Sequence, residues 1–301
     1  PHRFLEGALI ASLFIKASNV YIYMRDEYPA VIKILKAEIL KLENEKIIPK
    51  GHFVIRRGAG AYICGEESAM IESIEGKRGL PRHRPPYVAE VGLFNSPTLT
   101  NNLETLFWIR DILEKGAKWY AEKGTGGNKG FHSFSVSGRV KEPGVKVAPA
   151  GITIQELIDK YCGGMKEDHI FKGYLPGGAS GGILPASMNK IPLDYGSKEL
   201  TDAGCFLGSA AIVVLSDKDN MKDVALNLLK FFEEESCGQC TPCRVGTEKT
   251  VKLMKEKIWN KEKLADLSEV MSQASICGLG QAATNPLNSV LKYFGNEISY
   301  E

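Results

Sequence analysis

Four cysteines in the C-terminal part of this 301-residue chain have the spacing of a metal centre. Cys237, Cys240 and Cys243 lie in the run Cys-Gly-Gln-Cys-Thr-Pro-Cys, and Cys277 follows in Ile-Cys-Gly-Leu-Gly. Three thiolates at this spacing, joined by a fourth from a distant segment, make up the Cys₄ set that holds a [4Fe–4S] cluster. A structural zinc also takes four cysteines, although zinc sites more often use two Cys-x-x-Cys pairs. The sequence therefore favours iron–sulfur over zinc, and either metal over an empty set of thiols.

The other cysteines and the composition limit the kind of protein this is. Cys64, Cys162 and Cys205 have no framework spacing and the total of seven is odd, which favours a reducing compartment, so we expect a cytoplasmic protein. A net charge of +2 argues for neither a nucleic acid nor a membrane surface as partner. No apolar run approaches the length of a membrane span. An apolar helical pattern begins directly after Pro1-His2-Arg3, so we expect a fragment that lacks an N-terminal piece.

A glycine-rich segment is the second chemical signal. It runs from Gly58-Ala59-Gly60 through Tyr62 and Gly65 to Glu66-Glu67, where a helix is expected to begin. Glycines before a helix allow backbone N–H groups to approach a phosphate or a flavin, because the helix N-terminus attracts anions. The same glycines could form only a tight turn, and the two glutamates could be no more than partners of the helix dipole.

Three further segments carry polar, aromatic or flexible residues of interest. Asn101 and Asn102 could bond a planar heterocycle or could cap a helix. Tyr87, which follows Pro85-Pro86, could stack on a nucleobase or could be an ordinary exposed tyrosine. The glycine run 175–182 could bind a ligand or could be a flexible interdomain loop. The five histidines show neither metal spacing nor a partner set for nucleophilic catalysis.

The elements that position these residues fall into three parts. The first part alternates helical and strand patterns, which predicts an α/β layer with a largely parallel sheet. The second begins after a loop with four glycines and predicts a small α+β layout of β-grasp type. The third is helical and predicts a bundle. The predicted helices span 5–17, 29–42, 66–74, 102–113, 153–161, 221–232, 251–258, 264–271 and 287–294, and the strands 20–24, 53–56, 134–136, 145–147, 170–174 and 210–215.

Taken together, these segments resemble the flavin- and NADH-binding subunit of respiratory complex I, the 51 kDa type, and its diaphorase relatives. The relatives serve NAD-reducing hydrogenases and NAD-dependent formate dehydrogenases. The resemblance is carried, in chain order, by Pro1-His2, the segment 58–67, Pro85-Pro86-Tyr87, the segment 97–105, Pro176-Gly177-Gly178 and the four cysteines. Segments 178–187 and 207–211 look closer to the formate dehydrogenase β subunits than to complex I.

The resemblance implies an NADH dehydrogenase or diaphorase subunit that passes electrons from NAD(H) through FMN to a [4Fe–4S] cluster. It implies a partial Rossmann-like FMN/NADH domain over 1–127, a β-grasp domain of SLBB type over 128–216, and a helical cluster domain over 217–301. The implied partners are a small [2Fe–2S] thioredoxin-like subunit and a larger catalytic subunit. The family's first glycine-rich cofactor loop precedes its Pro-His, so we expect this chain by itself to hold FMN poorly. The implied FMN and NADH residues are Gly60, Tyr62, Gly65, Glu66, Glu67, Tyr87, Asn101, Asn102 and Thr105, with Leu279 near the flavin edge, and the implied cluster ligands are Cys237, Cys240, Cys243 and Cys277.

Overall fold

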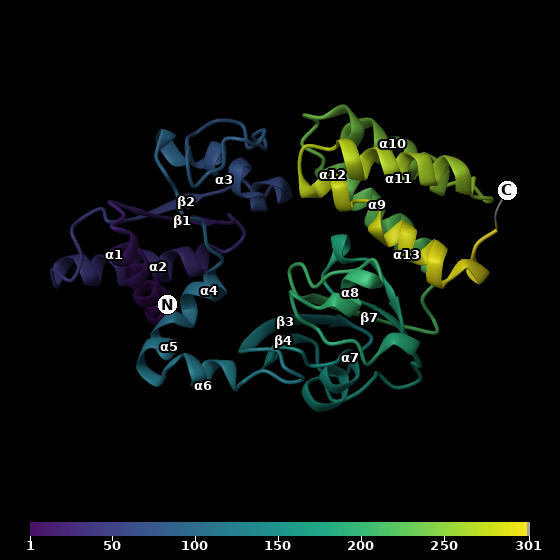
Figure 1. Cartoon of the computed structure of the whole chain (residues 1–301), viewed down its shortest axis with the longest axis horizontal. Helices are drawn as coiled ribbons and strands as arrows, with labels where there is room; N and C mark the ends of the chain where they lie inside the picture. The colour runs from purple at the N-terminus through teal and green to yellow at the C-terminus, as the bar shows by residue number, and fades with distance from the viewer. Residues whose placement is uncertain (300–301) are drawn as a thin grey trace. The chain divides into compact units, whose positions relative to one another are not determined.

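The computed structural model describes residues 1–299 of the chain as a mixed α/β protein (Figure 1). The chain divides into two compact units, Pro1–Ala117 and Lys118–Glu301. The mixed α/β character agrees with the sequence-based expectation, whereas the predicted division into three domains stays a prediction. None of the helices within residues 1–299 has the length and apolar character to cross a membrane.

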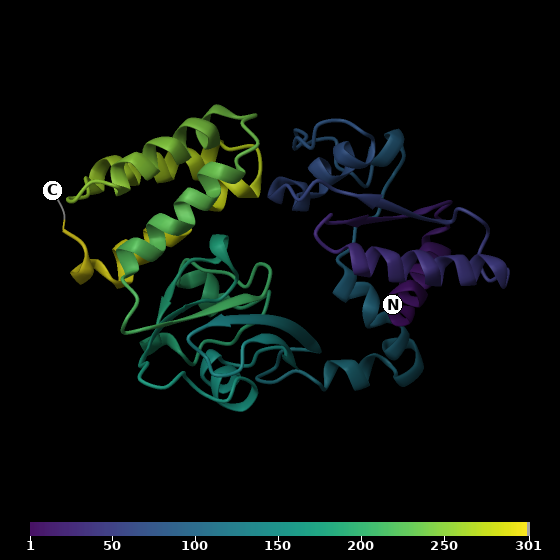
Figure 2. The same cartoon turned by 180° about the vertical axis from the view of Figure 1, so that it is seen from behind.

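The first unit is built on two parallel strands, β1 (Val20–Met24) and β2 (Phe53–Arg57), which pair in the register Val20 to Phe53. Parallel neighbours need a crossover, and α2 (Pro29–Asn44) provides it. Helices α1 (His2–Ile15) and α2 cover one face of the strands, and α3 (Glu67–Ile74) covers the other (Figures 1 and 2). Ile22 accordingly packs with α1 and α2, while its neighbours Tyr21 and Tyr23 pack with α3, as the strand period requires.

The rest of the first unit consists of a long loop and short helices. A single helix was expected over 102–113, but the structure has two, α4 (Leu103–Phe107) and α5 (Ile109–Lys115), with Trp108 between them. The Trp108 ring packs edge-on against Phe107 at this junction. Helix α6 (Ala117–Ala121) contains the boundary between the units. The short 3₁₀ turns of the first unit are Tyr62–Gly65 and Leu93–Asn95.

The second unit contains a five-stranded mixed sheet in the order β4-β3-β7-β5-β6. The expected hairpin forms, and the helix expected from residue 153 begins at Ile154, with Thr153 as its N-cap in a capping box with Glu156. That helix continues as a π-helical turn over Leu157–Tyr161. The strands and helices are β3 (Phe131–Gly138), β4 (Gly144–Pro149), α7 (Ile154–Glu156), β5 (Phe171–Leu175), β6 (Leu184–Pro185), α8 (Lys198–Asp202) and β7 (Ala211–Ser216), with 3₁₀ turns at Ala179–Gly181 and Ala186–Met188.

In the described residues the sheet is followed by helices, and those numbered α9, α10, α11 and α13 pack around the fully buried Trp259. The helix expected over 251–258 was placed wrongly, because the observed helix begins within the cysteine segment. It begins at Thr241, where Pro242 in the first turn favours a helix start, and ends at Met254. The helices are α9 (Met221–Glu235), α10 (Thr241–Met254), α11 (Lys261–Ala274), α12 (Gly278–Ala282) and α13 (Asn285–Tyr293), and a 3₁₀ turn spans Gly295–Glu297.

Candidate cofactor sites

The second unit brings the four predicted cluster cysteines together at the ends of its helices. Cys237 lies in the turn between α9 and α10, Cys240 is the N-cap of α10, and Cys277 is the N-cap of α12. Cys243, in the first turn of α10, is buried and lies within electrostatic range of the other three thiols. Helix N-termini stabilise thiolates, so this placement suits metal ligands.

The surroundings of Cys243 favour its neutral, protonated form. Burial, together with the three neighbouring cysteines and against the hydrogen bond with Ser236, raises the pKa of Cys243 to about 11. Metal binding therefore has to displace a proton from this sulfur. In the part of the chain that the structure describes, no three Cys, His, Asp or Glu side chains gather closely enough to hold one metal ion. The other three cysteines nevertheless lie near enough to Cys243 to influence its charge.

Hydrogen bonds hold the cysteine loop in shape. Gly238 has φ of 78°, a left-handed conformation that side chains disfavour. Arg244 donates from Nη1 to the Gly238 carbonyl over 2.5 Å and from Nη2 to Thr241 Oγ1 over 3.3 Å. The Ser236 hydroxyl lies 3.4 Å from Cys243 Sγ and accepts from the Gly238 N–H. The loop is therefore ordered by its own residues.

The contact between α12 and α10 leaves one polar atom without a partner. A Cβ on Gly280 would lie 2.4 Å from Ser275 Oγ and 2.8 Å from Cys243 Cβ, so only glycine allows the two helices this close. Ser275 Oγ is buried and has no hydrogen-bond partner among the described residues. An unpaired donor beside a ligand thiol fits a site that receives further acceptors, such as the sulfurs of a cluster. The residues present therefore fit a [4Fe–4S] group.

The glycine run 175–182 is a packed connection, so its interpretation as a flexible loop is wrong. A Cβ on Gly177 would lie 2.2 Å from the Leu207 carbonyl oxygen, and one on Gly182 would lie 2.5 Å from Cys205 Sγ. Asn285 Nδ2 on α13 donates to the Ser180 carbonyl over 2.9 Å. The run thereby ties the sheet of the second unit to the helices that follow Cys277.

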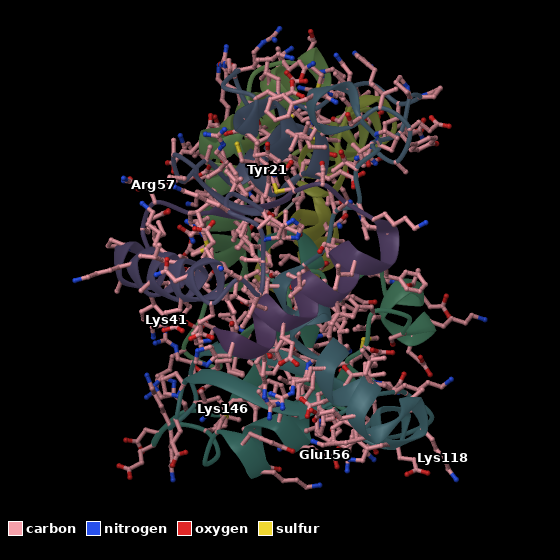
Figure 3. The ribbon with its side chains drawn as sticks, turned by 90° about the vertical axis from the view of Figure 1, so that its left-hand side faces the viewer. Tyr21, Lys41, Arg57, Lys118, Lys146 and Glu156 are labelled. Carbon is pink, nitrogen blue, oxygen red and sulfur yellow. The ribbon has the colours of Figure 1, made fainter. Side chains whose placement is uncertain are left out.

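The glycine-rich segment of the first unit forms the turn after β2. Arg57, labelled in Figure 3, ends the strand and pairs with Asp26. The Gly58 N–H donates to the Met24 carbonyl over 2.7 Å, and a Cβ on Gly58 would strike the ring of Tyr23. These contacts test neither the tight-turn nor the ligand-binding interpretation of the segment, and both stay predictions. Gly65, at the end of the 3₁₀ turn, is exposed and would have open space around a Cβ, so a ligand can approach its backbone.

The two glutamates at the start of α3 are held by an arginine. Glu66 Oε2 accepts from the N–H groups of Ser68 and Ala69 at 3.0 Å each, so Glu66 is the helix cap. Arg84 Nη2 lies 2.5 Å from Glu66 Oε1 and 2.8 Å from Glu67 Oε1. Glu67 also accepts from Thr100 Oγ1 over 2.9 Å. Neither Arg84 nor Thr100 was predicted as a site residue, although Thr100 lies in the segment 97–105 and Arg84 lies three residues before Tyr87.

The side chains of Asn101 and Asn102 have different surroundings. Asn102 Oδ1 accepts from the Glu104 N–H over 2.9 Å and caps α4, as the alternative interpretation expected. Asn101 is exposed and lines a cavity of about 360 Å³ between α1, β1 and the 93–101 loop. Glu104 Oε1 is buried without a hydrogen-bond partner among the described residues, and the sequence analysis missed it as a candidate. Of the predicted FMN and NADH residues, Asn101 alone lines this cavity.

The remaining predicted residues are distributed over both units. Tyr87 is 56% exposed and Tyr62 is 43% exposed, so both rings are accessible for stacking. Gly60 adopts φ of 77° in the turn after β2, and Thr105 lies exposed on α4. Leu279 is buried on α12 in the second unit.

Comparisons with known proteins cover nearly the whole chain. Residues 1–111 match the family model described as the Nuo51 FMN-binding domain, and residues 223–301 match the iron–sulfur binding region of NADH-ubiquinone oxidoreductase-F. The corresponding NADH-quinone oxidoreductase subunits of Rickettsia conorii and Rhizobium meliloti are each 37% identical, over 99% of this chain and 74% of the relative. An H₂-reduced NAD⁺-reducing [NiFe]-hydrogenase superposes with a TM-score of 0.88 at 32% identity over 98% of this chain. The present chain spans about half of that hydrogenase chain, 51%.

Proposed function

Because the chain belongs to the family of 51 kDa-type NADH-quinone oxidoreductase subunits, we propose that it passes electrons from NADH through FMN to one [4Fe–4S] cluster. It is an NADH dehydrogenase or diaphorase subunit, and its cofactors are FMN, NAD(H) and the [4Fe–4S] cluster. The observation that carries the proposal is the meeting of four thiols at helix ends, next to a buried hydroxyl that has no partner among the described residues.

The protein's own residues supply binding, orientation and electrostatics. When bound, the flavin accepts an electron pair as hydride and the iron–sulfur cluster takes single electrons. Cys237, Cys240, Cys243 and Cys277 hold the cluster, and Arg244 keeps their loop in shape. Electron transfer of this kind needs no side-chain nucleophile.

The first unit provides the surroundings of the flavin and the nucleotide. Glu66 and Glu67 place negative charge near the flavin, and Arg84 offsets part of that charge. Tyr87 offers an exposed ring for the adenine of NADH. The cofactor is contacted by the backbone at Gly60 and Gly65 and by the side chains of Tyr62, Asn101, Asn102 and Thr105.

The domain assignment follows the same proposal. Residues 1–127 form part of a Rossmann-like FMN/NADH domain, supported by the parallel strands β1 and β2 with their crossover helix. Residues 128–216 form a β-grasp domain of SLBB type, supported by the mixed five-stranded sheet. Residues 217–301 form the cluster domain.

The parent complex is the finer part of the proposal. The named relatives are subunits of NADH-quinone oxidoreductase and an NAD⁺-reducing hydrogenase, so this chain works with partner subunits. We infer that these are a small [2Fe–2S] subunit and a larger catalytic subunit. Segments 178–187 and 207–211 are the support for a formate dehydrogenase, and no relative named above is one.

The test uses the protein purified without oxygen and supplied with iron, sulfide and FMN. NADH should bleach the flavin absorbance, and a reduced-cluster EPR signal should follow. If a chemical reductant reduces the cluster but NADH does not, the protein binds a cluster and does not carry out the proposed electron transfer. Zinc in place of iron would overturn the cluster assignment as well.

A further inference from the structure

We propose that Ser275 donates a hydrogen bond to a sulfur of the [4Fe–4S] cluster on the Cys243 side, and that this bond raises the cluster's reduction potential. The inference rests on the proposed function, because it requires the cluster to be bound. It assigns a role to a residue that is not itself a ligand.

The backbone of Ser275 is fixed, whereas its hydroxyl is left without a partner among the described residues. The residue follows α11 directly and lies two positions before Cys277. Its N–H donates to the Met271 carbonyl over 3.3 Å, and its own carbonyl accepts from Gln281 Nε2 over 3.0 Å. The residue is only 5% exposed, so water cannot readily satisfy Oγ. Buried hydroxyls without partners are rare, because losing water without a new bond is unfavourable.

The position of the hydroxyl identifies the acceptor. Both Ser275 Oγ and Cys243 Cβ lie against the same point above Gly280, at 2.4 Å and 2.8 Å from where its Cβ would be. The hydroxyl therefore lies beside the most buried of the four thiols. Thiolate and sulfide sulfurs accept hydrogen bonds, so the bound cluster supplies what Ser275 lacks.

Ser236 approaches the same cysteine from another helix end. Its hydroxyl, just after α9, lies 3.4 Å from Cys243 Sγ. The hydroxyl groups of Ser236 and Ser275, which follow two different helices, thus both lie near Cys243. Reduction adds negative charge to the cluster sulfurs, and hydrogen-bond donors stabilise that charge, which raises the reduction potential.

The test compares Ser275→Ala with Ser275→Thr, which keeps the donor, in cluster-loaded protein. Ser272→Ala is the matched control, because Ser272 is exposed on the same helix end and bonds the Glu269 carbonyl. An EPR-monitored redox titration measures the potential. At a fixed ambient potential, Ser275→Ala should lower the ratio of reduced to oxidised cluster about tenfold, equivalent to about 59 mV for one electron. Ser275→Thr and Ser272→Ala should match the wild type.

Pulsed EPR in deuterated water gives a second readout that needs no variant to fold. An exchangeable deuteron should couple to the reduced cluster in the wild type and weaken in Ser275→Ala. A fully loaded Ser275→Ala protein with an unchanged potential would overturn the inference and leave the cluster assignment intact. Absence of the coupling in the wild type would overturn it even if Ser275→Ala lost its iron. A wild type that binds no cluster would instead contradict the proposed function.

Discussion

Replacing Gly280 by alanine tests whether the close contact between α12 and α10 maintains the cysteine site. The new methyl carbon would lie 2.4 Å from Ser275 Oγ and 2.8 Å from Cys243 Cβ. Favourable contacts between carbon atoms lie at about 3.5–4.0 Å, so α12 has to move away from α10. Because Cys277 is the N-cap of α12, this movement displaces one of the four ligands.

The magnitude follows from two opposing effects. Overpacking a buried contact costs about 1–3 kcal/mol, whereas alanine gains up to about 1 kcal/mol over glycine within a helix. Gly278 provides a matched control, since it lies in the same helix, is exposed and has open space where a Cβ would be. The difference between the two variants in free energy of unfolding isolates the effect of the clash. We therefore expect Gly280→Ala to be less stable than Gly278→Ala by about 1–3 kcal/mol.

Two measurements check this expectation. Urea unfolding of the metal-free variants gives the free energy of unfolding, and iron analysis after reconstitution gives cluster loading. Gly280→Ala should lose both stability and iron relative to Gly278→Ala. If the two variants unfold at the same urea concentration and load the same iron, the contact does not position the site and the reasoning fails.

Two further predictions concern the nucleotide and the second unit. Tyr87→Ala in FMN-loaded protein should weaken NADH binding about ten- to a hundredfold, because stacking on a base is worth roughly 1–3 kcal/mol. Tyr28→Ala removes a similarly exposed ring and should leave the dissociation constant for NADH unchanged. An equal loss of affinity in both variants would remove Tyr87 from the site. The bond from Arg139, assisted by hydrogen bonds from Ser216, lowers the pKa of Asp219 from 3.8 to about 2. The carboxylate therefore stabilises the fold above pH 3.8 and loses that contribution as the pH falls through about 2. Asp219→Asn should therefore reduce the free energy of unfolding by about 2 kcal/mol at pH 7 and by almost nothing at pH 2, and urea titrations that show the same loss at both pH values would contradict the ion-pair explanation.

Local patterns predicted much of the framework. Strand β1 occupies the residues expected for it, and β2 and α2 differ from expectation only at their C-terminal ends, because apolar periodicity and turn residues define them within a short window. The start of α10 was missed because its first turn consists of cysteine-loop residues whose apolar spacing is not helical. Pro242 is compatible with a helix start there, and the burial of Cys243 and Gly246 shows that these residues pack as part of the helix.

In the candidate sites, too, local patterns could be predicted from the sequence and tertiary contacts could not. The triple Cys237, Cys240 and Cys243 could be predicted as ligands because its spacing is a local property of the chain, and the assignment of all four cysteines stays a prediction. Arg84 and Thr100 were missed because their roles arise from contacts with Glu66, 18 residues away, and Glu67, 33 residues away. The role of Ser275 could not be predicted from the sequence, because it depends on the packing of α12 against α10, which buries the hydroxyl.

The most direct test of the cluster assignment compares Cys240→Ala with Cys64→Ala after anaerobic reconstitution. Cys240 belongs to the four-thiol set, whereas Cys64 is buried in the first unit, outside that set. Iron content and the reduced-state EPR signal are measured on both variants and the wild type. We expect the wild type and Cys64→Ala to carry a [4Fe–4S] cluster and Cys240→Ala to lose most of its iron and signal. Full iron and an unchanged signal in Cys240→Ala would contradict the account.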